Sequence, residues 1–248
     1  MSARPTVAIA LTLYLALASP AFSQDIPAPF EGLMLQEMHR TVMDDLRERN
    51  LGIRGNSPAR PRATTARRAA AGQTVSTAYR PSPQVSAKVR AQFAQHMTRQ
   101  TGPEGGRKVA AAMQARDPVR NWAQLVAADG LRPGDAADAL AGYWVLNWMI
   151  ANRGDNNRVQ TLAVRDQVRA IMTSNPAYAR LSEAQRQEFA EVLMLNFLVQ
   201  QAAYVDALKR GDQAALQRLG DAAVARFKGE MGVDLRRLRL TERGFAKG

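Results

Sequence analysis

The sequence predicts an all-α fold, a single helical bundle of about six to seven helices preceded by a tethered amphipathic helix and a disordered linker. Beyond residue 83, apolar residues recur every three or four positions, as they do on one face of a helix. Helix start and stop residues separate these periodic segments, and the chain shows no β-hairpin signal, no strand–helix–strand pattern and no fixed-period repeat. Two stretches are apolar on every side, which is typical of helices at the centre of a bundle.

The first 23 residues are expected to be a secretory signal peptide. A short basic start precedes the apolar run Val7 to Ala18, whose length of ~18 Å as a helix is too short for a bilayer core of ~30 Å. Ala21 and Ser23 then place small side chains at positions −3 and −1 of a cleavage site after Ser23. We therefore expect a periplasmic or secreted protein with no transmembrane span after cleavage.

Two segments lie between the signal peptide and the expected bundle. Residues 24–50 hold an amphipathic helix, and its apolar stripe consists of Leu35, Met38, Val42 and Leu46. This stripe predicts burial, either on the body of the protein or on a partner. Residues 51–83 are rich in Arg, Pro and Ala and hold few large apolar residues, so they are expected to form a disordered or extended linker.

The positive charge of the chain is concentrated in and just after this linker. The formal net charge is +12, and residues 51–90 carry eight basic residues and no acidic one. The candidate contacts to an anionic envelope component, a membrane surface or a protein partner are Arg60, Arg62, Arg67 and Arg68. The alternative is a solvated spacer. Nucleic acid is not an expected partner, because the protein is exported and the linker holds one aromatic residue, Tyr79.

Residues 84–248 are expected to form the helical domain, with recognisable helix ends. The expected start residues are Asp117 with Pro118, Asp135, Asp155, Ser182 with Gln185, and Asp212. The expected end residues are Gly130, Gly154, Asn175 with Pro176, Gly211 and Gly232. Near the start of the domain, Gly105 and Gly106 are expected to open a short alanine-rich helix. The C-terminal residues mix helix and strand periods and indicate, at most, a short extended segment.

The run ALAGYWVLNWMIANRGD, residues 139–155, places Tyr143, Trp144 and Trp148 within six positions. Aromatic residues at helical spacing can line a binding pocket, but the helix is apolar all the way round, and this pattern favours the buried core. The run around Asn196 and Phe197 has the same character. We therefore expect two central helices, one from each run.

Each of these apolar runs holds one asparagine, Asn147 in the first and Asn196 in the second. A buried amide without a partner costs ~1–3 kcal/mol, so both side chains are expected to be hydrogen-bonded. The two amides could pair with each other and fix the register of the helices. A backbone carbonyl, water or Tyr204 are the alternative partners.

The catalytic and metal-binding motifs that we sought are missing or weak. The chain has no cysteine and two histidines, His39 and His96, which lie in different segments, so neither a metal nor a cofactor is expected. The acids nearest to an apolar helix are Glu183, Glu188 and Glu191. They leave open a hydrolase that acts on envelope material with a carboxylate in a helical cleft. Their position at a helix start is also explained by the helix dipole alone.

Three features together resemble an uncharacterised family of exported bacterial helical proteins. They are the secretion signal with its basic spacer, the aromatic helix from Ala139 to Trp148, and the closing stretch Leu235 to Phe245. The likeness covers residues 84–245 and implies a helical fold, but it transfers no site residues. The sequence thus favours a non-enzymatic binding or accessory protein, with the envelope hydrolase and the membrane-surface binder as alternatives.

Overall fold

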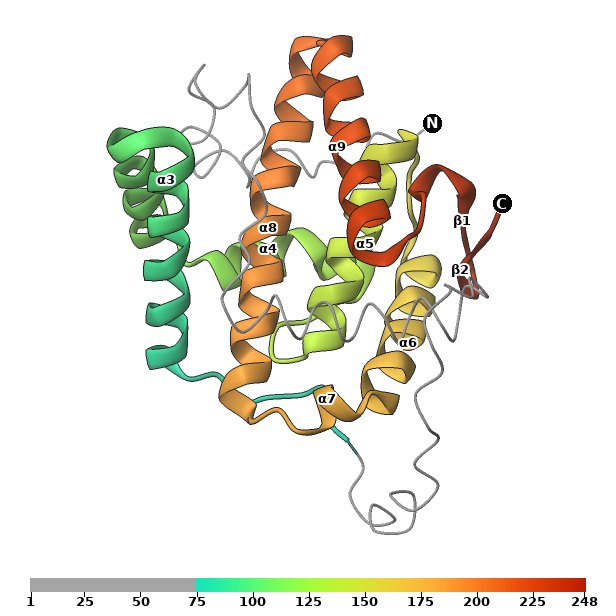
Figure 1. The fold of residues 1–248 in the computed structure, drawn as a ribbon, viewed down its shortest axis with the longest axis horizontal. Helices are drawn as coiled ribbons and strands as arrows, with labels where there is room; N and C mark the ends of the chain where they lie inside the picture. The colour runs from blue at the N-terminus through green and yellow to red at the C-terminus, as the bar shows by residue number, and fades with distance from the viewer. Residues whose placement is uncertain (1–74) are drawn as a thin grey trace.

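The computed structural model describes residues 75–248, which form seven α-helices and a two-stranded sheet (Figure 1). The helices are α3 (Pro83–Ala115), α4 (Pro118–Val126), α5 (Ala136–Asn152), α6 (Arg158–Ser174), α7 (Pro176–Ala179), α8 (Glu183–Arg210) and α9 (Gln213–Met231). Two short 3₁₀ helices are η3 (Ala127–Asp129) and η4 (Leu235–Arg237), and the strands are β1 (Leu238–Thr241) and β2 (Gly244–Lys247). The all-α prediction is confirmed. The expected signal peptide and N-terminal amphipathic helix lie outside the described residues.

The core is centred on α5 and α8, the two helices that the apolar runs predict. α5 packs against α8, α6 and α9, and α3 and α4 pack against α8. From Ala136 to Asn147 every residue of α5 is buried, and so is every residue of α8 from Gln187 to Leu198. A helix segment that is buried on all sides has no solvent-facing polar face, which is why these two segments consist mostly of apolar residues. No helix among residues 75–248 is both long and apolar enough to cross a membrane.

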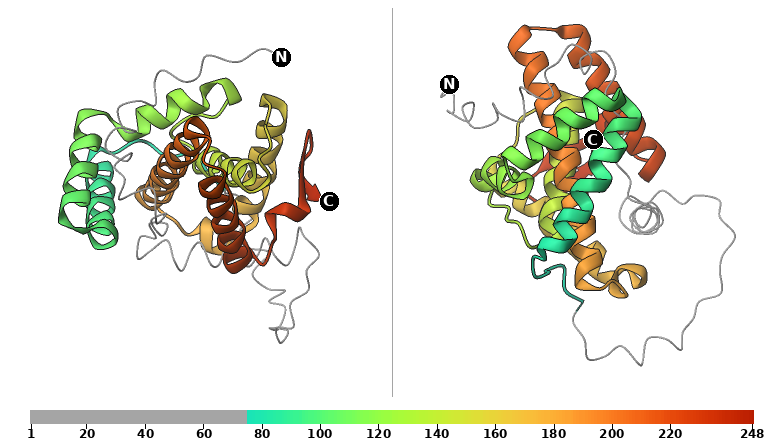
Figure 2. Two further views of the ribbon diagram at one scale, coloured as in Figure 1. Left: turned by 90° about the horizontal axis from the view of Figure 1, so that it is seen from above. Right: turned by 90° about the vertical axis from the view of Figure 1, so that its left-hand side faces the viewer.

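The helix α3 lies on α8 at the side of the molecule opposite the C-terminal strands (Figures 1 and 2). It is kinked at Gly102, whose φ of +80° is not helical, and Pro103 follows. The second half of α3 therefore starts at this Gly–Pro pair, three residues before the expected pair Gly105 and Gly106, which lie buried inside the helix. A proline at the first helical position fits this restart, because its missing N–H has no partner to lose there.

Most of the expected helix caps are confirmed. Asp117, Asp135, Ser182 and Asp212 each accept a hydrogen bond from a backbone N–H in the first turn of the following helix. The turn after α5 differs from the prediction. Arg153, with φ of +49°, takes the left-handed position that we assigned to Gly154, and Asn157 in a capping box with Gln160 starts α6 in place of Asp155.

Residues 75–82 are docked on the body through an antiparallel bridge at Ala78, so the expected disorder does not hold for this end of the linker. Tyr79 donates its backbone N–H to Gly134 at 2.9 Å, and the carbonyl of Thr77 accepts from Ala136 at 2.9 Å. The side chains of Thr77 and Tyr79 are buried. Arg169 also reaches the Thr77 hydroxyl at 3.3 Å. This segment, residues 75–82, is hereafter called the strap. A backbone bridge and the buried Tyr79 ring hold it on the body. Amino-acid composition does not predict such contacts.

The chain ends in a β-hairpin, which the sequence analysis did not expect. β1 and β2 pair antiparallel, from Leu238 opposite Lys247 to Thr241 opposite Gly244. Gly244 has φ of +97°, a conformation that costs a glycine little, and it closes the turn. Helix side chains bond the hairpin backbone: the Trp148 ring nitrogen donates to the Leu238 carbonyl at 2.9 Å, and Gln167 accepts from the Phe245 N–H at 2.9 Å.

Candidate functional site

The helix α5 has two faces with different roles, and its aromatic residues occupy one of them. Tyr143 stacks on Phe227 of α9 with ring centroids 6.2 Å apart, and Trp144 meets the same ring edge-on at 6.2 Å. Trp144 and Trp148 both lie against Phe245 of the hairpin, at 6.5 and 6.4 Å. These rings fill the space between α5, α9 and β2. Tyr143 and Trp144 are buried in the core, Trp148 is half-buried and packs against it, and none of the three lines the pocket described below.

Asn147, fully buried on α5, uses both ends of its amide without reaching α8. Its nitrogen donates to the Tyr143 carbonyl at 2.8 Å, and its oxygen accepts from the Arg226 guanidinium of α9 at 2.6 Å. Of the alternatives for this amide, a backbone carbonyl is therefore one partner, and Arg226 is a partner that the sequence did not suggest. Asn196 is also buried, on α8. A bond between the two amides is not needed to satisfy Asn147.

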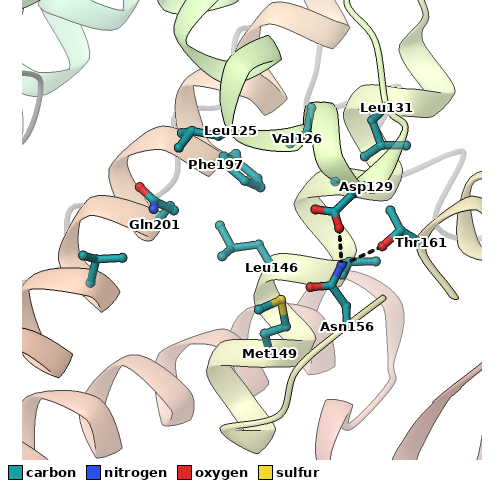
Figure 3. Close-up of a pocket in the computed structure, with 13 residues that line it drawn as sticks. Leu125, Val126, Asp129, Leu131, Leu146, Met149, Asn156, Thr161, Phe197 and Gln201 are labelled. Carbon is teal, nitrogen blue, oxygen red and sulfur yellow. Dashed lines mark hydrogen bonds between the residues drawn. The ribbon is translucent and has the colours of Figure 1, made fainter. Parts of the chain in front are cut away.

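The other face of α5 lines a pocket that it shares with α4, η3, α8 and the start of α6 (Figure 3). The pocket has a volume of about 210 Å³. Its apolar wall consists of Leu125, Val126, Leu131, Gly142, Val145, Leu146, Met149, Phe197 and Val205. A side chain at Gly142 would approach Leu131 and Trp122 to within 3.3 Å, so a glycine at this position lets α5 lie close to its neighbours.

One end of this pocket is polar. The side-chain nitrogen of Asn156 donates to Asp129 Oδ1 at 3.0 Å and to Thr161 Oγ1 at 2.7 Å, so both of its hydrogens are used. The Asn156 oxygen points away from these two partners (Figure 3) and is an acceptor at the pocket. Gln201 on α8 adds a second amide on the opposite wall. A ligand that fits this arrangement is mostly apolar and carries a hydrogen-bond donor at one end.

The volume limits the size of that ligand. Sites for drug-sized molecules hold about 300–1,000 Å³, whereas an apolar cavity of about 150 Å³ accommodates benzene. A volume of about 210 Å³ therefore corresponds to one aromatic ring system or a short aliphatic chain. The pocket suits a small molecule or one projecting group of a larger partner.

Among the acids that the sequence singled out, Glu191 has a carboxyl whose pKa is shifted by its surroundings. Burial raises the pKa of its carboxyl, while hydrogen bonds from Gln187 and Ser86 and the charge of Arg90 lower it in part. Ser86 of α3 and Gln187 donate to the same carboxylate oxygen at 2.7 and 2.8 Å. Gln187 also bonds the Ser82 backbone through both ends of its amide. The Glu191 network thus fastens the start of α3 to α8, and Glu191 is not among the residues lining the pocket.

Asp138 is a second buried carboxyl with a structural role. Burial raises its pKa, and the Arg132 N–H, which donates to it at 2.9 Å, opposes this effect. Arg169 of α6 lies between Asp138 at 3.2 Å and Asp135 at 3.1 Å. Together these bonds hold the turn before α5 beside the strap. Among residues 75–248, no group of three or more His, Cys, Asp or Glu side chains gathers as it would around a metal ion.

A family model matches residues 2–246, which is nearly the whole chain. The chain belongs to this family, DUF6683, a family of unknown function. No curated protein and no solved structure matches the chain. The DUF6683 match extends over the strap, the pocket and the hairpin, and also over the N-terminal part of the chain. An uncharacterised family, as the sequence resemblance implied, is thereby confirmed, and DUF6683 membership assigns no activity.

The sequence-predicted and observed site residues of this DUF6683 protein overlap at one position. Phe197, expected in the core, also lines the pocket. The anionic-partner candidates Arg60, Arg62, Arg67 and Arg68 lie outside the described residues. The polar end of the pocket was missed, because Asp129 and Asn156 stand at the ends of separate helices and their sequence signal is that of helix termini. Gly142, a glycine inside an otherwise apolar helix, was the one local signal of a close approach.

Proposed function

We propose that this DUF6683 protein is an exported, non-enzymatic binding or accessory protein that recognises one small, mostly apolar group in the pocket between α4, α5 and α8. The observation that carries the proposal is the pocket itself, with about 210 Å³ of space, apolar walls and the Asn156 acceptor at one end. Such a combination of apolar walls with a few placed polar groups is typical of ligand sites.

A binding role has more support than hydrolysis of envelope material. Hydrolysis of a glycosidic bond needs two carboxyls on either side of the scissile bond. Glu191 and Asp138, the buried carboxyls with raised pKa values, belong to hydrogen-bond networks that join helices to neighbouring segments. Asp129, the carboxyl at the pocket, accepts a hydrogen bond from Asn156. The pocket thus supplies shape and a few hydrogen-bonding side chains, Asn156, Gln201 and Asp129, which suits recognition.

Indole is a suitable first probe, because it is an aromatic ring system with one N–H donor. We expect saturable binding of indole to the full mature chain, measured by calorimetry. Val205→Phe on α8 narrows the pocket and should weaken binding at least about tenfold, or roughly 1.4 kcal/mol. The matched control is Leu208→Phe, an exposed position one turn further along α8, which should bind indole like the parent protein.

Two results would contradict the pocket as a binding site. One is the absence of indole binding at concentrations where it remains soluble, together with no binding of a short alcohol such as hexanol. The other is equal binding by the Val205→Phe and Leu208→Phe variants. A circular dichroism melt of each variant shows whether a loss of binding reflects the pocket or a loss of fold.

Export is a separate part of the proposal and rests on residues 1–23. When the full gene product is expressed in a Gram-negative host, we expect the mature protein in the periplasmic fraction with Gln24 as its N-terminal residue. Intact mass spectrometry of that fraction measures the cleavage position directly. A protein that retains Met1 and stays in the cytoplasm would overturn export and leave the pocket proposal standing.

A further inference from the structure

We propose that the C-terminal hairpin is a docking surface for an anionic lipid bilayer, in addition to the pocket. Residues 235–248 hold five basic residues and one acidic residue. Arg236 pairs with Asp221 of α9 at 2.6 Å. The other four basic residues are Arg237, Arg239, Arg243 and Lys247, and all four are exposed. Within residues 75–248, no ion pair joins any of these four to an acidic side chain.

Three of these four charges lie at one end of the hairpin. Arg237 ends η4 and Arg239 lies in β1, on either side of Leu238, and Lys247 lies opposite Leu238 in the neighbouring strand. Arg243 lies in the turn at the other end of the same short hairpin. Like charges near one another repel, so an anionic surface relieves the repulsion among the three charges at this end.

The hairpin holds these charges in a fixed position at the edge of the molecule. Figures 1 and 2 show it on the outside of the fold, at the side opposite α3. Its inner side chains Leu238, Leu240 and Phe245 are buried. Gln160 donates to the Leu240 carbonyl at 3.3 Å, and Gln167 donates to the Phe245 carbonyl at 3.2 Å. The charges therefore reach a surface without any rearrangement of the fold.

The same contacts argue against a peptide partner that would add a strand to the sheet. Strand addition needs free backbone groups along an exposed edge. Here Trp148 and Gln160 occupy carbonyls of β1, and Gln167 occupies both the N–H and the carbonyl of Phe245 in β2. The exposed charged side chains of the hairpin are mostly basic, and Glu242 is the one acid among residues 235–248. Anionic lipid headgroups attract each nearby Arg or Lys roughly independently, which suits charges spread over a convex edge.

The test is co-sedimentation of the full mature chain with vesicles of phosphatidylglycerol mixed with phosphatidylcholine, compared with vesicles of phosphatidylcholine alone. We expect binding to the anionic vesicles, with loss at high salt. The hairpin variant carries four substitutions, Arg237→Gln, Arg239→Gln, Arg243→Gln and Lys247→Gln. Its partition coefficient should fall on the order of a hundredfold or more. A variant with lysine at the three arginine positions should bind like the parent.

Two controls with the same loss of charge separate the hairpin from net charge and from the linker. The body control replaces exposed arginines elsewhere, namely Arg99, Arg107, Arg180 and Arg218, with glutamine. The linker control does the same to Arg60, Arg62, Arg67 and Arg68. Both should lose much less binding than the hairpin variant.

Three outcomes would overturn the proposal. The first is a hairpin variant that binds anionic vesicles like the parent, and the second is an equal loss in either control variant. The third is binding of soluble polyglutamate that is as tight as binding of the vesicles and equally sensitive to the hairpin substitutions, which would assign the surface to an acidic polymer. The far-ultraviolet spectrum and melting temperature of the hairpin variant establish that it is folded.

Discussion

Asn147 is a fully buried polar residue on an otherwise mostly apolar helix. Asn147→Leu removes the acceptor of the half-buried Arg226 guanidinium and one partner of the buried Tyr143 carbonyl. We expect a loss of about 1–3 kcal/mol in the free energy of unfolding, measured by urea denaturation.

The matched variant is the double replacement Asn147→Leu with Arg226→Met. It removes the stranded guanidinium together with its acceptor, so it should be more stable than Asn147→Leu alone. If the double variant shows the plain sum of the two single losses, the bond between Asn147 and Arg226 is not coupled to folding.

Glu191 is the residue that should make stability depend on pH. Burial raises the pKa of its carboxyl above the ordinary value of 4.5, so the folded state holds the proton more tightly than the unfolded chain. Below the ordinary pKa both states are protonated and this carboxyl costs nothing. As the pH rises through the raised pKa, the folded state must ionise a buried carboxyl and loses stability. Arg90 favours the ionised form, and Asp117 opposes it.

Glu191→Gln should therefore unfold with a smaller loss of stability between pH 4.5 and pH 8 than the parent protein, measured by urea denaturation at each pH. Ser86 keeps an acceptor in this variant, because the glutamine oxygen replaces the carboxylate oxygen. The control is Glu183→Gln, an exposed position at the start of the same helix. Parallel pH profiles for the parent and Glu191→Gln would rule out this carboxyl as the cause.

At the scale of elements, Gln167 joins the hairpin to α6. Its amide accepts from the Phe245 N–H at 2.9 Å and donates to the Phe245 carbonyl at 3.2 Å, as a neighbouring strand would. Gln167→Ala should speed hydrogen exchange at the Phe245 amide at least about tenfold, equivalent to roughly 1.4 kcal/mol of local stability. Gln217→Ala, which loses a bond to Asp221 on α9, should leave that amide unchanged. Equal exchange in both variants would contradict this role of Gln167.

The boundaries of helices were predictable where one local residue decides them. Asp117, Asp135, Ser182 and Asp212 cap helices because a side-chain oxygen next to the first turn satisfies a free N–H, and that interaction is written in the sequence. The turn after α5 was not predictable in the same way. A methyl group at Gly154 would meet the Trp148 ring at 2.8 Å, so the glycine serves close packing and Arg153 takes the left-handed conformation.

The hairpin and the pocket were missed for a related reason. Glu242 and Arg243 in the turn carry no Asn-Gly or Asp-Gly signal, and Trp148, Gln160 and Gln167, which satisfy the hairpin backbone, are about 80–90 residues distant in the chain. The pocket depends on which face of α5 meets which neighbour. Because α5 is apolar on both faces, its sequence does not distinguish the face that packs on α9 from the face that lines the pocket.

For the whole molecule, the strap marks where the folded body begins. A chain that starts at Val75 keeps the Tyr79 ring and the backbone bonds to Gly134 and Ala136, whereas a chain that starts at Pro83 loses them. We expect the longer chain to melt like the mature protein. The shorter chain should lose about 3 kcal/mol and melt roughly 10 °C lower.

Scanning calorimetry of the three chains measures this difference. Equal melting temperatures for the two truncated chains would show that the strap contributes nothing to stability. A chain from Val75 that melts well below the mature protein would show instead that residues 24–74 dock on the body, which is one of the two destinations expected for the stripe of Leu35, Met38, Val42 and Leu46.

The methionine methyl groups offer a direct measurement of whether this protein binds a small apolar group between α4, α5 and α8. Met149 lines the pocket, whereas Met113 is buried on α3 and Met172 is buried on α6. In a ¹³C-methyl methionine spectrum of the full mature chain titrated with indole, we expect the Met149 signal to move saturably while those of Met113 and Met172 stay in place. A Met149 signal that does not move while indole binds, or equal shifts of all three signals, would contradict this expectation.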